Sequence, residues 1–154
     1  MKYLAPPLQA LLWGVIAYYL SQSFSTLTFA TATSWVFIGG FIGAGLVIDV
    51  LALAQMIKAR TSINPIQLNG TRILLTTGVY SFSRNPMYLG MLCYLIALTY
   101  ALANPMAAIA PIGFVLMLNQ TQIKREERWM REQFGEDYEE YSATVRRWFG
   151  SKRA

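Results

Sequence analysis

Long apolar stretches separated by short polar connections fill most of this 154-residue chain. Four of them approach or exceed the ~17–25 residues that a helix needs to cross the hydrocarbon of a bilayer. They cover residues 7–29, 34–57, 86–103 and 105–120. The pattern predicts an all-α integral membrane protein with four transmembrane helices, built as one membrane domain over residues 1–154.

Charged residues gather after the last apolar stretch. Of the 21 charged side chains, two lie in residues 1–57, none in 87–123 and fifteen in 124–154. An average soluble domain is about 25% charged, whereas this chain is only 14% charged and distributes its charges unevenly. The sequence therefore argues against a soluble protein. It predicts a polar, helical, cytoplasmic tail over residues 121–154.

Lysine and arginine set the expected orientation of the spans. All 13 fall at Lys2, in the connection 58–86 or in the tail, and the connections 30–33 and 104–105 carry none. Short loops that are rich in Lys and Arg stay in the cytoplasm. An even number of spans with both termini cytoplasmic is therefore predicted.

The residue inventory excludes several classes of function. The chain has no His and a single Cys, Cys93, inside an apolar stretch. Histidine-based catalysis, zinc centres and Cys/His nucleophilic pairs are thereby excluded, and no metal site is expected. The net charge of +5 comes from basic residues where loops leave the membrane. Since nothing resembles a nucleic-acid recognition module, no nucleic-acid partner is expected either.

The connection before the third apolar stretch is too polar and specific for a simple linker. It reads TRILLTTGVYSFSRNPMYLG over residues 71–90. Ser83 or Asn85 can cap a helix whose first turn contains Pro86. Arg84, beside the free N–H groups of that helix start, would make an anion site. The alternative is an ordinary capped helix whose arginine reaches up to the membrane interface.

The end of the fourth stretch places polar side chains on one helix face. Asn119, Gln122 and Glu126 follow i, i+3, i+7 spacing within residues 119–134. Glu126 and Glu127 directly follow two basic residues, so a solvated helix with local ion pairs is the alternative. Considered together with the anion site, the carboxylate predicts a pocket for a zwitterionic ligand with an amino acid end.

Phe134-Gly135 predicts a helix stop, and a second helix is expected to begin at Glu136. Aromatic and apolar residues then repeat at helical spacing before a basic cluster, at Tyr138, Tyr141, Val145 and Trp148. An amphipathic helix of this kind lies on a membrane surface. It could equally cover a cytoplasmic pocket, and the two roles are compatible.

Asp49 is the only acidic residue within a predicted span. An ionisable side chain in a membrane segment is a functional candidate by default, as in a small four-helix transporter or assembly protein. The alternative is structural, with Asp49 accepting a hydrogen bond from Tyr18 or Tyr19 of the first span. Close helix packing is also predicted for the second span by its glycines, Gly39, Gly40, Gly43 and Gly45.

An ordered set of motifs resembles one protein family. The motifs are GVYSFSRNPMYLG at 78–90, Asn104-Pro105, Glu126-Glu127 and FGEDYEEYSATVRRW at 134–148. Over residues 60–149 the chain resembles the isoprenylcysteine carboxyl methyltransferases, which are related to the membrane phospholipid methyltransferases. The resemblance implies an S-adenosylmethionine-dependent methyltransferase, and the form RNPMYLG implies a protein of a bacterial inner membrane.

The resemblance also implies which residues form the site. Those that would hold S-adenosylmethionine on the cytoplasmic side are Arg72, Ile73, Leu74, Leu75, Tyr80, Asn85, Pro86, Met87, Tyr88 and Glu126. Among them, Glu126 would pair with the ammonium group of the cofactor. Arg84 and Glu127 are the catalytic candidates, and no residue is assigned as a general base. Gln122 and Asn119 would face the acceptor.

The acceptor is expected to be lipophilic and to enter sideways from the bilayer. The enzymes that the chain resembles place an Arg four residues before the Glu matching Glu126, where it faces the substrate carboxylate. This chain has Gln122 there, and a neutral amide is a poor carboxylate anchor, which argues against a prenylcysteine. A nicotinamide-dependent membrane reductase, which would share a similar Arg-x-Pro-x-Tyr-x-Gly string, is the alternative enzyme class.

Overall fold

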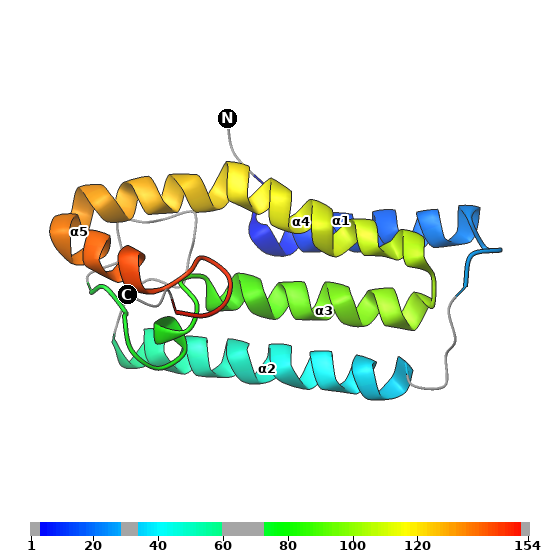
Figure 1. The fold of residues 1–154 in the computed structure, drawn as a ribbon, viewed down its shortest axis with the longest axis horizontal. Helices are drawn as coiled ribbons and strands as arrows, with labels where there is room; N and C mark the ends of the chain where they lie inside the picture. Colours follow the sequence, from blue (N-terminus) through cyan, green and yellow to red (C-terminus); the bar gives the residue numbers. More distant parts are fainter. Residues whose placement is uncertain (1–3, 29–33, 60–72, 152–154) are drawn as a thin grey trace.

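A computed structural model describes residues 4–28, 34–59 and 73–151, and their regular structure is helical (Figure 1). The five α-helices are α1 (Pro6–Ser23), α2 (Ser34–Lys58), α3 (Pro86–Leu102), α4 (Ile109–Leu118) and α5 (Lys124–Thr144). Two 3₁₀ turns and one π-helical turn complete the set, at η2 (Gly78–Ser81), η3 (Pro105–Ala108) and η4 (Asn119–Ile123). The predicted all-helical class is confirmed for the described residues.

Helix α3 lies in the middle of the bundle (Figure 1). α2 packs along one side of it, while α1 and α4 pack against it and against each other on the other side. The core between α1, α3 and α4 contains Phe114 and Leu118, which are fully buried, and Leu95 from α3. Tyr88 and Ile123 extend this core toward the end of the bundle where α5 lies.

Within the described residues, two helices are long and apolar enough to cross a membrane. They are Trp35–Lys58, and the continuous helical run Pro105–Thr144; α3 is a shorter apolar helix. On α2, large apolar side chains such as Trp35 and Val36 are almost fully exposed, as expected of a surface that faces lipid. α1 ends at Ser23 rather than at residue 29. The arrangement with four spans therefore remains a prediction.

The predicted turn at Asn104-Pro105 joins α3 to the α4 run. Ala103 ends α3 in the left-handed conformation, and the side chain of Asn104 accepts a hydrogen bond from the Met106 N–H. Its amide Nδ2 donates to the carbonyls of Ser21 and Phe24, at 3.1 and 2.9 Å. The turn thus fastens the hairpin of α3 and α4 to the end of α1.

The packing of α2 on α3 corrects two predictions. Asp49 accepts a hydrogen bond from Tyr94 of α3, at 2.8 Å, and not from Tyr18 or Tyr19, because α1 lies on the far side of α3. Of the four glycines only Gly45 makes a close approach, to Tyr94 and to the Gly90 carbonyl. The other three, Gly39, Gly40 and Gly43, have open space beside them.

The tail folds back at Gly135, where the predicted helix stop is confirmed as a kink inside α5. Gly135 has φ +51°, a conformation that favours glycine. The second half of α5 then buries Tyr138, Tyr141 and Val145 in a cluster with Leu74, Met130 and Phe134. These aromatic residues therefore pack inside the protein, as expected of a helix that covers a pocket, and its placement on a membrane surface remains a prediction.

Candidate functional site

The start of α3 is held by contacts with Arg147, near the end of the described residues, rather than by a capping bond from the Asn85 side chain. Asn85 occupies the N-cap position and Pro86 the first turn, as predicted. The Asn85 side chain, however, makes no capping bond; it donates to the carbonyl of Arg147, at 3.0 Å. Ser83 instead accepts the Asn85 N–H, at 3.1 Å, and its hydroxyl also donates to the Arg147 carbonyl. The two predicted capping residues thus bind a segment that sequence spacing had not connected to them.

Tyr88 and Glu126 meet at the junction of α3 and α5. The Tyr88 hydroxyl donates to Glu126 Oε1 at 2.6 Å, and Gln122 Nε2 donates to the same oxygen at 2.7 Å. Tyr88 and Gln122 are buried, and Glu126 is partly exposed. Three residues predicted to face the cofactor or the acceptor are therefore in direct contact, although two chain segments supply them.

A π-helical turn determines which side chains of the run from α4 to α5 face Tyr88. Asn119–Ile123 inserts a wider turn between α4 and α5, and such turns are frequent at functional sites. Gln122 near its end contacts Glu126 in the first turn of α5, whereas Asn119 at its start accepts a hydrogen bond from the indole Nε1 of Trp148, at 3.1 Å. The predicted stripe is thus divided, with Asn119 bound to the chain end and not to Glu126.

Glu127 has a different environment from its neighbour Glu126. Its carboxylate accepts two hydrogen bonds from Arg147, both 2.7 Å long, and forms an ion pair with Arg84 Nη2 at 3.2 Å. Arg84 Nη1 donates in turn to the hydroxyl of Tyr138, at 2.9 Å. Glu127, Tyr138 and the side chain of Arg84 are buried. The two catalytic candidates, Arg84 and Glu127, therefore neutralise each other within a network that also includes the tail.

The remaining predicted cofactor residues border this network. Tyr80 lies in η2, and its carbonyl accepts a hydrogen bond from the Tyr141 hydroxyl at 2.6 Å. Leu74 packs against the Tyr138 cluster, Ile73 is exposed, and Leu75 and Met87 are partly buried. Arg72 lies outside the described residues.

The two glutamates differ in their proton affinity. Burial raises the pKa of Glu126, although hydrogen bonds from Tyr88 and Gln122 act in the opposite direction. Burial also acts to raise the pKa of Glu127, but hydrogen bonds from Arg147 and the charges of Arg84 and Arg147 outweigh it, and that pKa is lowered. Burial raises the pKa of Tyr80 to about 12. Glu127 is therefore the carboxylate that is held ionised by its partners.

This assignment predicts an acid-sensitive contribution to stability. The folded-state pKa of Glu127 lies below its ordinary value of 4.5, so its ion pairs stabilise the fold fully above that value. The contribution is lost as the pH falls through the lower, folded-state pKa. We expect Glu127→Gln to reduce the dependence of unfolding free energy on pH below about pH 4.5. Chemical unfolding of the detergent-solubilised protein at several pH values measures this dependence. Glu132 is exposed, and the control Glu132→Gln should keep the wild-type dependence of unfolding free energy on pH.

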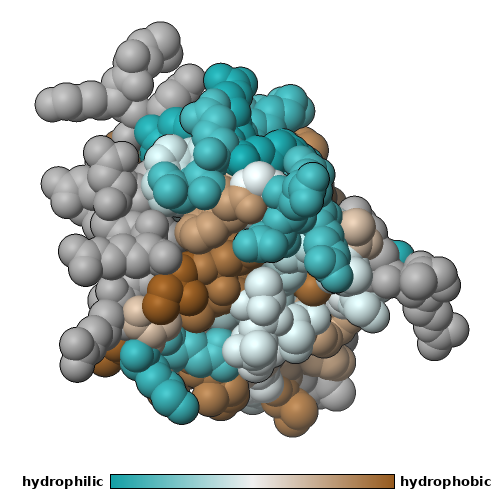
Figure 2. All heavy atoms as spheres, turned by 90° about the vertical axis from the view of Figure 1, so that its left-hand side faces the viewer, coloured by the Kyte–Doolittle hydropathy of each residue, from teal (hydrophilic) through white to brown (hydrophobic). Residues whose placement is uncertain are grey.

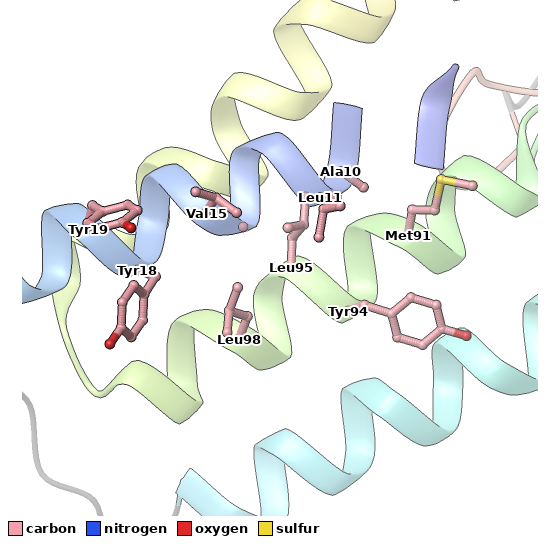
Figure 3. Close-up of a pocket in the computed structure, with 10 residues that line it drawn as sticks. Ala10, Leu11, Val15, Tyr18, Tyr19, Met91, Tyr94, Leu95 and Leu98 are labelled. Carbon is pink, nitrogen blue, oxygen red and sulfur yellow. The ribbon is translucent and has the colours of Figure 1, made fainter. Parts of the chain in front are cut away.

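An apolar groove runs along α1 and α3 beside this site (Figure 3). Its volume is about 550 Å³, within the range of ligand pockets. Leu11 and Val15 of α1 and Leu95 and Leu98 of α3 line it, and Met91 does so one turn beyond Tyr88. The groove does not include Tyr88 or Glu126, so the apolar groove and the polar contacts are neighbouring features.

The polar surface at this end of the molecule is uneven (Figure 2). Hydrophilic side chains gather over α5 at the top of this view, and hydrophobic residues remain visible between polar ones in its centre. Arg147, Trp148 and Tyr138 are part of the network, although the sequence had indicated them only as an aromatic and basic tail. Their helical spacing gave no signal of a contact with residues 83–85, because that contact depends on the fold-back at Gly135.

Comparison with known proteins points to methyltransferases. The model of a family described as phospholipid methyltransferase matches residues 35–137. A probable protein-S-isoprenylcysteine O-methyltransferase of Oryza sativa subsp. indica is 35% identical over 104 residues, which are 66% of this chain and 53% of that protein. The protein-S-isoprenylcysteine O-methyltransferase of Saccharomyces cerevisiae is 36% identical over 73 residues, 47% of this chain and 30% of that protein.

A shorter relative is matched over almost its whole length. An uncharacterized protein of Haemophilus influenzae is 45% identical over 62 residues, which are 40% of this chain and 98% of that protein. No solved structure matches. The chain thus spans about half the length of the rice protein and about a third of the yeast protein.

Proposed function

Because this chain belongs to the phospholipid methyltransferase family, we propose that it is an integral membrane methyltransferase. It transfers the methyl group of S-adenosylmethionine to a lipophilic acceptor. The observation that carries the proposal is the contact of Tyr88 and Gln122 with the Glu126 carboxylate. This contact joins the two motifs that the sequence had assigned to one pocket.

The proposed topology places this contact at the inner boundary of a bacterial inner membrane. α1, α2, α3 and the apolar residues 105–120 cross the bilayer, with both termini and residues 121–154 on the cytoplasmic side. The absence of charged side chains between Arg84 and Lys124 supports this arrangement, as does the exposed apolar surface of α2.

The residues present suit an S-adenosylmethionine with its ammonium and sulfonium groups. Both hydrogen bonds to Glu126 end on Oε1, and Oε2 can accept from an ammonium group. The rings of Tyr80 and Tyr88 suit a sulfonium cation. Residues 72–75 and Asn85 to Met87 complete the proposed binding surface. When bound, S-adenosylmethionine would supply a methyl group to the acceptor nucleophile: the carbon–sulfur bond breaks and S-adenosylhomocysteine leaves as a neutral thioether.

The chain contributes mainly alignment and exclusion of water. Methyl displacement needs the acceptor atom in line with the methyl–sulfur bond, and holding two reactants in that geometry supplies much of the rate. Arg84 and Glu127, which we retain as candidates, neutralise each other. Their proposed role is to hold the two sides of the pocket together. Proton transfer is not required of them, in keeping with a chain that has no His.

The acceptor would approach along the apolar groove. Its lining by Leu11, Val15, Leu95 and Leu98 suits a hydrocarbon chain, and Met91 brings its end within one helical turn of Tyr88. Gln122 and Asn119 are proposed to face the reacting end of the acceptor. The neutral amide of Gln122 favours an uncharged or cationic reacting group over a prenylcysteine carboxylate.

Incubation of the purified protein with labelled S-adenosylmethionine and a total lipid extract tests this function. We expect label in a lipid-soluble product, whose identification gives the acceptor. Parallel titration with NADPH and S-adenosylmethionine separates a methyltransferase from a nicotinamide-dependent reductase. Binding of NADPH without S-adenosylmethionine binding would contradict the proposal, as would proton-coupled flux that Asp49→Asn abolishes in a protein that binds neither.

We expect Gln122→Arg to change the preference among acceptors more than the affinity for the cofactor. An Arg can still donate to Glu126 and adds a charge that binds an acceptor carboxylate, worth about 1.5–3 kcal/mol for a hydrogen bond to a charged group. The ratio of kcat/KM for a prenylcysteine to kcat/KM for the native acceptor should rise about tenfold or more. An equal loss of activity for every acceptor would remove Gln122 from the acceptor side of the site.

A further inference from the structure

A short segment beyond α5 crosses the start of α3. Residues 145–151, here called the strap, turn back on themselves through a bridge between Val145 and Ser151 and a hydrogen bond from the Arg146 N–H to the Gly150 carbonyl. The strap lies outside residues 35–137, which the family model matches. Nothing in that match therefore assigns it a role.

The backbone of the strap pairs with the connection that precedes α3. The Arg84 N–H donates to the Arg146 carbonyl at 3.1 Å, and the Gly150 N–H donates to the Phe82 carbonyl at 2.8 Å. The carbonyl of Arg147 accepts the side chains of Ser83 and Asn85. The strap thus fixes the conformation of residues 82–85.

The side chain of Arg147 binds the opposite side of the site. Its Nε and Nη2 donate to the two carboxylate oxygens of Glu127, each at 2.7 Å. This paired geometry is specific to the planar guanidinium group, because a lysine ammonium presents a single point charge. One residue therefore binds the segment before α3 through its carbonyl and the first turn of α5 through its guanidinium.

We infer that Arg147 is a positioning residue of the cofactor site, an inference that rests on the proposed function. Glu126 directly precedes Glu127 in the first turn of α5. Fixing Glu127 to the strap fixes the rotation of that turn and with it the direction of Glu126 toward Tyr88. Arg147 acts through Glu127 and Asn85 and needs no contact with the cofactor itself.

The adjacent residue Arg146 provides a matched control. It lies in the same strap and carries the same charge, but its side chain is exposed. Its backbone carbonyl, which accepts the Arg84 N–H, is unaffected by a change of side chain. Arg146→Gln and Arg147→Gln thus remove the same charge from neighbouring positions and differ in the contact with Glu127.

The test measures S-adenosylmethionine affinity of the detergent-solubilised full chain, together with KM for both substrates. For Arg147→Gln we expect cofactor affinity to fall about 10- to 100-fold, as for small displacements within a site. The KM for the acceptor should stay within about twofold. Arg146→Gln should match the wild type, and Arg147→Lys, which keeps the charge but not the paired hydrogen bonds, should lie between.

The pH profile gives a second measurement that a merely stabilising strap would not change. Glu127 faces Arg147 of the strap, Arg84 of the connection before α3, and Arg131 and Tyr138 of α5, with Glu126 beside it. Loss of Arg147 removes the hydrogen bonds that lower the Glu127 pKa. Glu126, whose pKa is raised, governs the main acidic limb of kcat/KM for the cofactor. The separate Glu127 step at lower pH should move to higher pH in Arg147→Gln and stay in place in Arg146→Gln.

The outcomes distinguish a failure of the proposed function from a failure of the proposed role of Arg147. If the wild type binds no S-adenosylmethionine, the proposed function and the role of Arg147 both fail. If the wild type binds it and a folded Arg147→Gln binds within twofold of it, the role of Arg147 alone is overturned. If Arg147→Gln does not fold, Arg147→Lys provides the test. A wild-type S-adenosylmethionine affinity together with a wild-type pH profile in Arg147→Lys would also overturn the positioning role of Arg147.

Discussion

Replacing Glu126 by Gln should weaken binding of S-adenosylmethionine by about 2–5 kcal/mol, the range for breaking a buried, hydrogen-bonded charge pair. The amide oxygen of Gln can still accept the hydroxyl of Tyr88, so the local packing is retained. What is lost is the negative charge opposite the ammonium group of the cofactor. At 1.4 kcal/mol per factor of ten, the dissociation constant should rise at least about 30-fold.

Calorimetric titration of the detergent-solubilised protein measures this change. Glu132→Gln is the matched control, since Glu132 is an exposed glutamate of the same helix and its loss alters the net charge equally. Glu132→Gln should bind like the wild type. Unchanged affinity in Glu126→Gln would remove Glu126 from the cofactor site, whatever the fate of the methyltransferase activity.

A second large effect is expected from Gly90→Ala in α3. A Cβ atom at Gly90 would overlap the carboxylate of Asp49 on α2, so the two helices must separate or the Asp49 side chain must turn away. Forcing extra volume into a packed interface costs about 1–3 kcal/mol. Turning the Asp49 side chain away would instead break its hydrogen bond with Tyr94, at a cost of about 1–3 kcal/mol. By either route, a loss of about 1–3 kcal/mol of unfolding free energy is expected.

Gly40→Ala is the control for this substitution. Gly40 is also a glycine of a long apolar helix, but nothing lies within 4 Å of the place where its Cβ would be. Its stability should change by less than about 0.5 kcal/mol. Denaturant unfolding in detergent compares the two variants. Equal stability of Gly90→Ala and the wild type would show that α2 does not pack on Gly90 as described.

The features that sequence alone predicted are those encoded locally. The bounds of α2 and α3 follow from hydropathy, since an uncharged run ends where polar residues begin. The turn at Asn104-Pro105 and the kink at Gly135 follow from residues with restricted or unusual backbone preferences. That the start of α3 and Glu126 face one region was predicted because a tight turn holds their two helices antiparallel, and the contact of Tyr88 with Glu126 lies there.

The features that sequence did not predict depend on side chains far apart in the chain. Asp49 could be seen to need a donor, but the choice of Tyr94 over Tyr18 depends on which helix lies against α2. The pairing of Arg147 with Glu127 requires the fold-back at Gly135, and both residues looked like members of a solvated charged tail. The π-helical turn at Asn119–Ile123 has no signature in the spacing of polar residues, which is why Asn119 was placed with Gln122.

The central place of α3 has a consequence for how this chain enters a bilayer. α1 packs on α3 and α4, and α2 packs on α3, so the two helices that precede α3 in the described part of the chain both depend on it for packing. In the proposed four-span topology, Asp49 lacks its Tyr94 partner until α3 is inserted, and the flanks of α1 and α2 that later pack on α3 contact lipid or the insertion machinery. We therefore expect the committed step of assembly to be the arrival of the third helix, with earlier intermediates held in the membrane by their hydrophobicity alone.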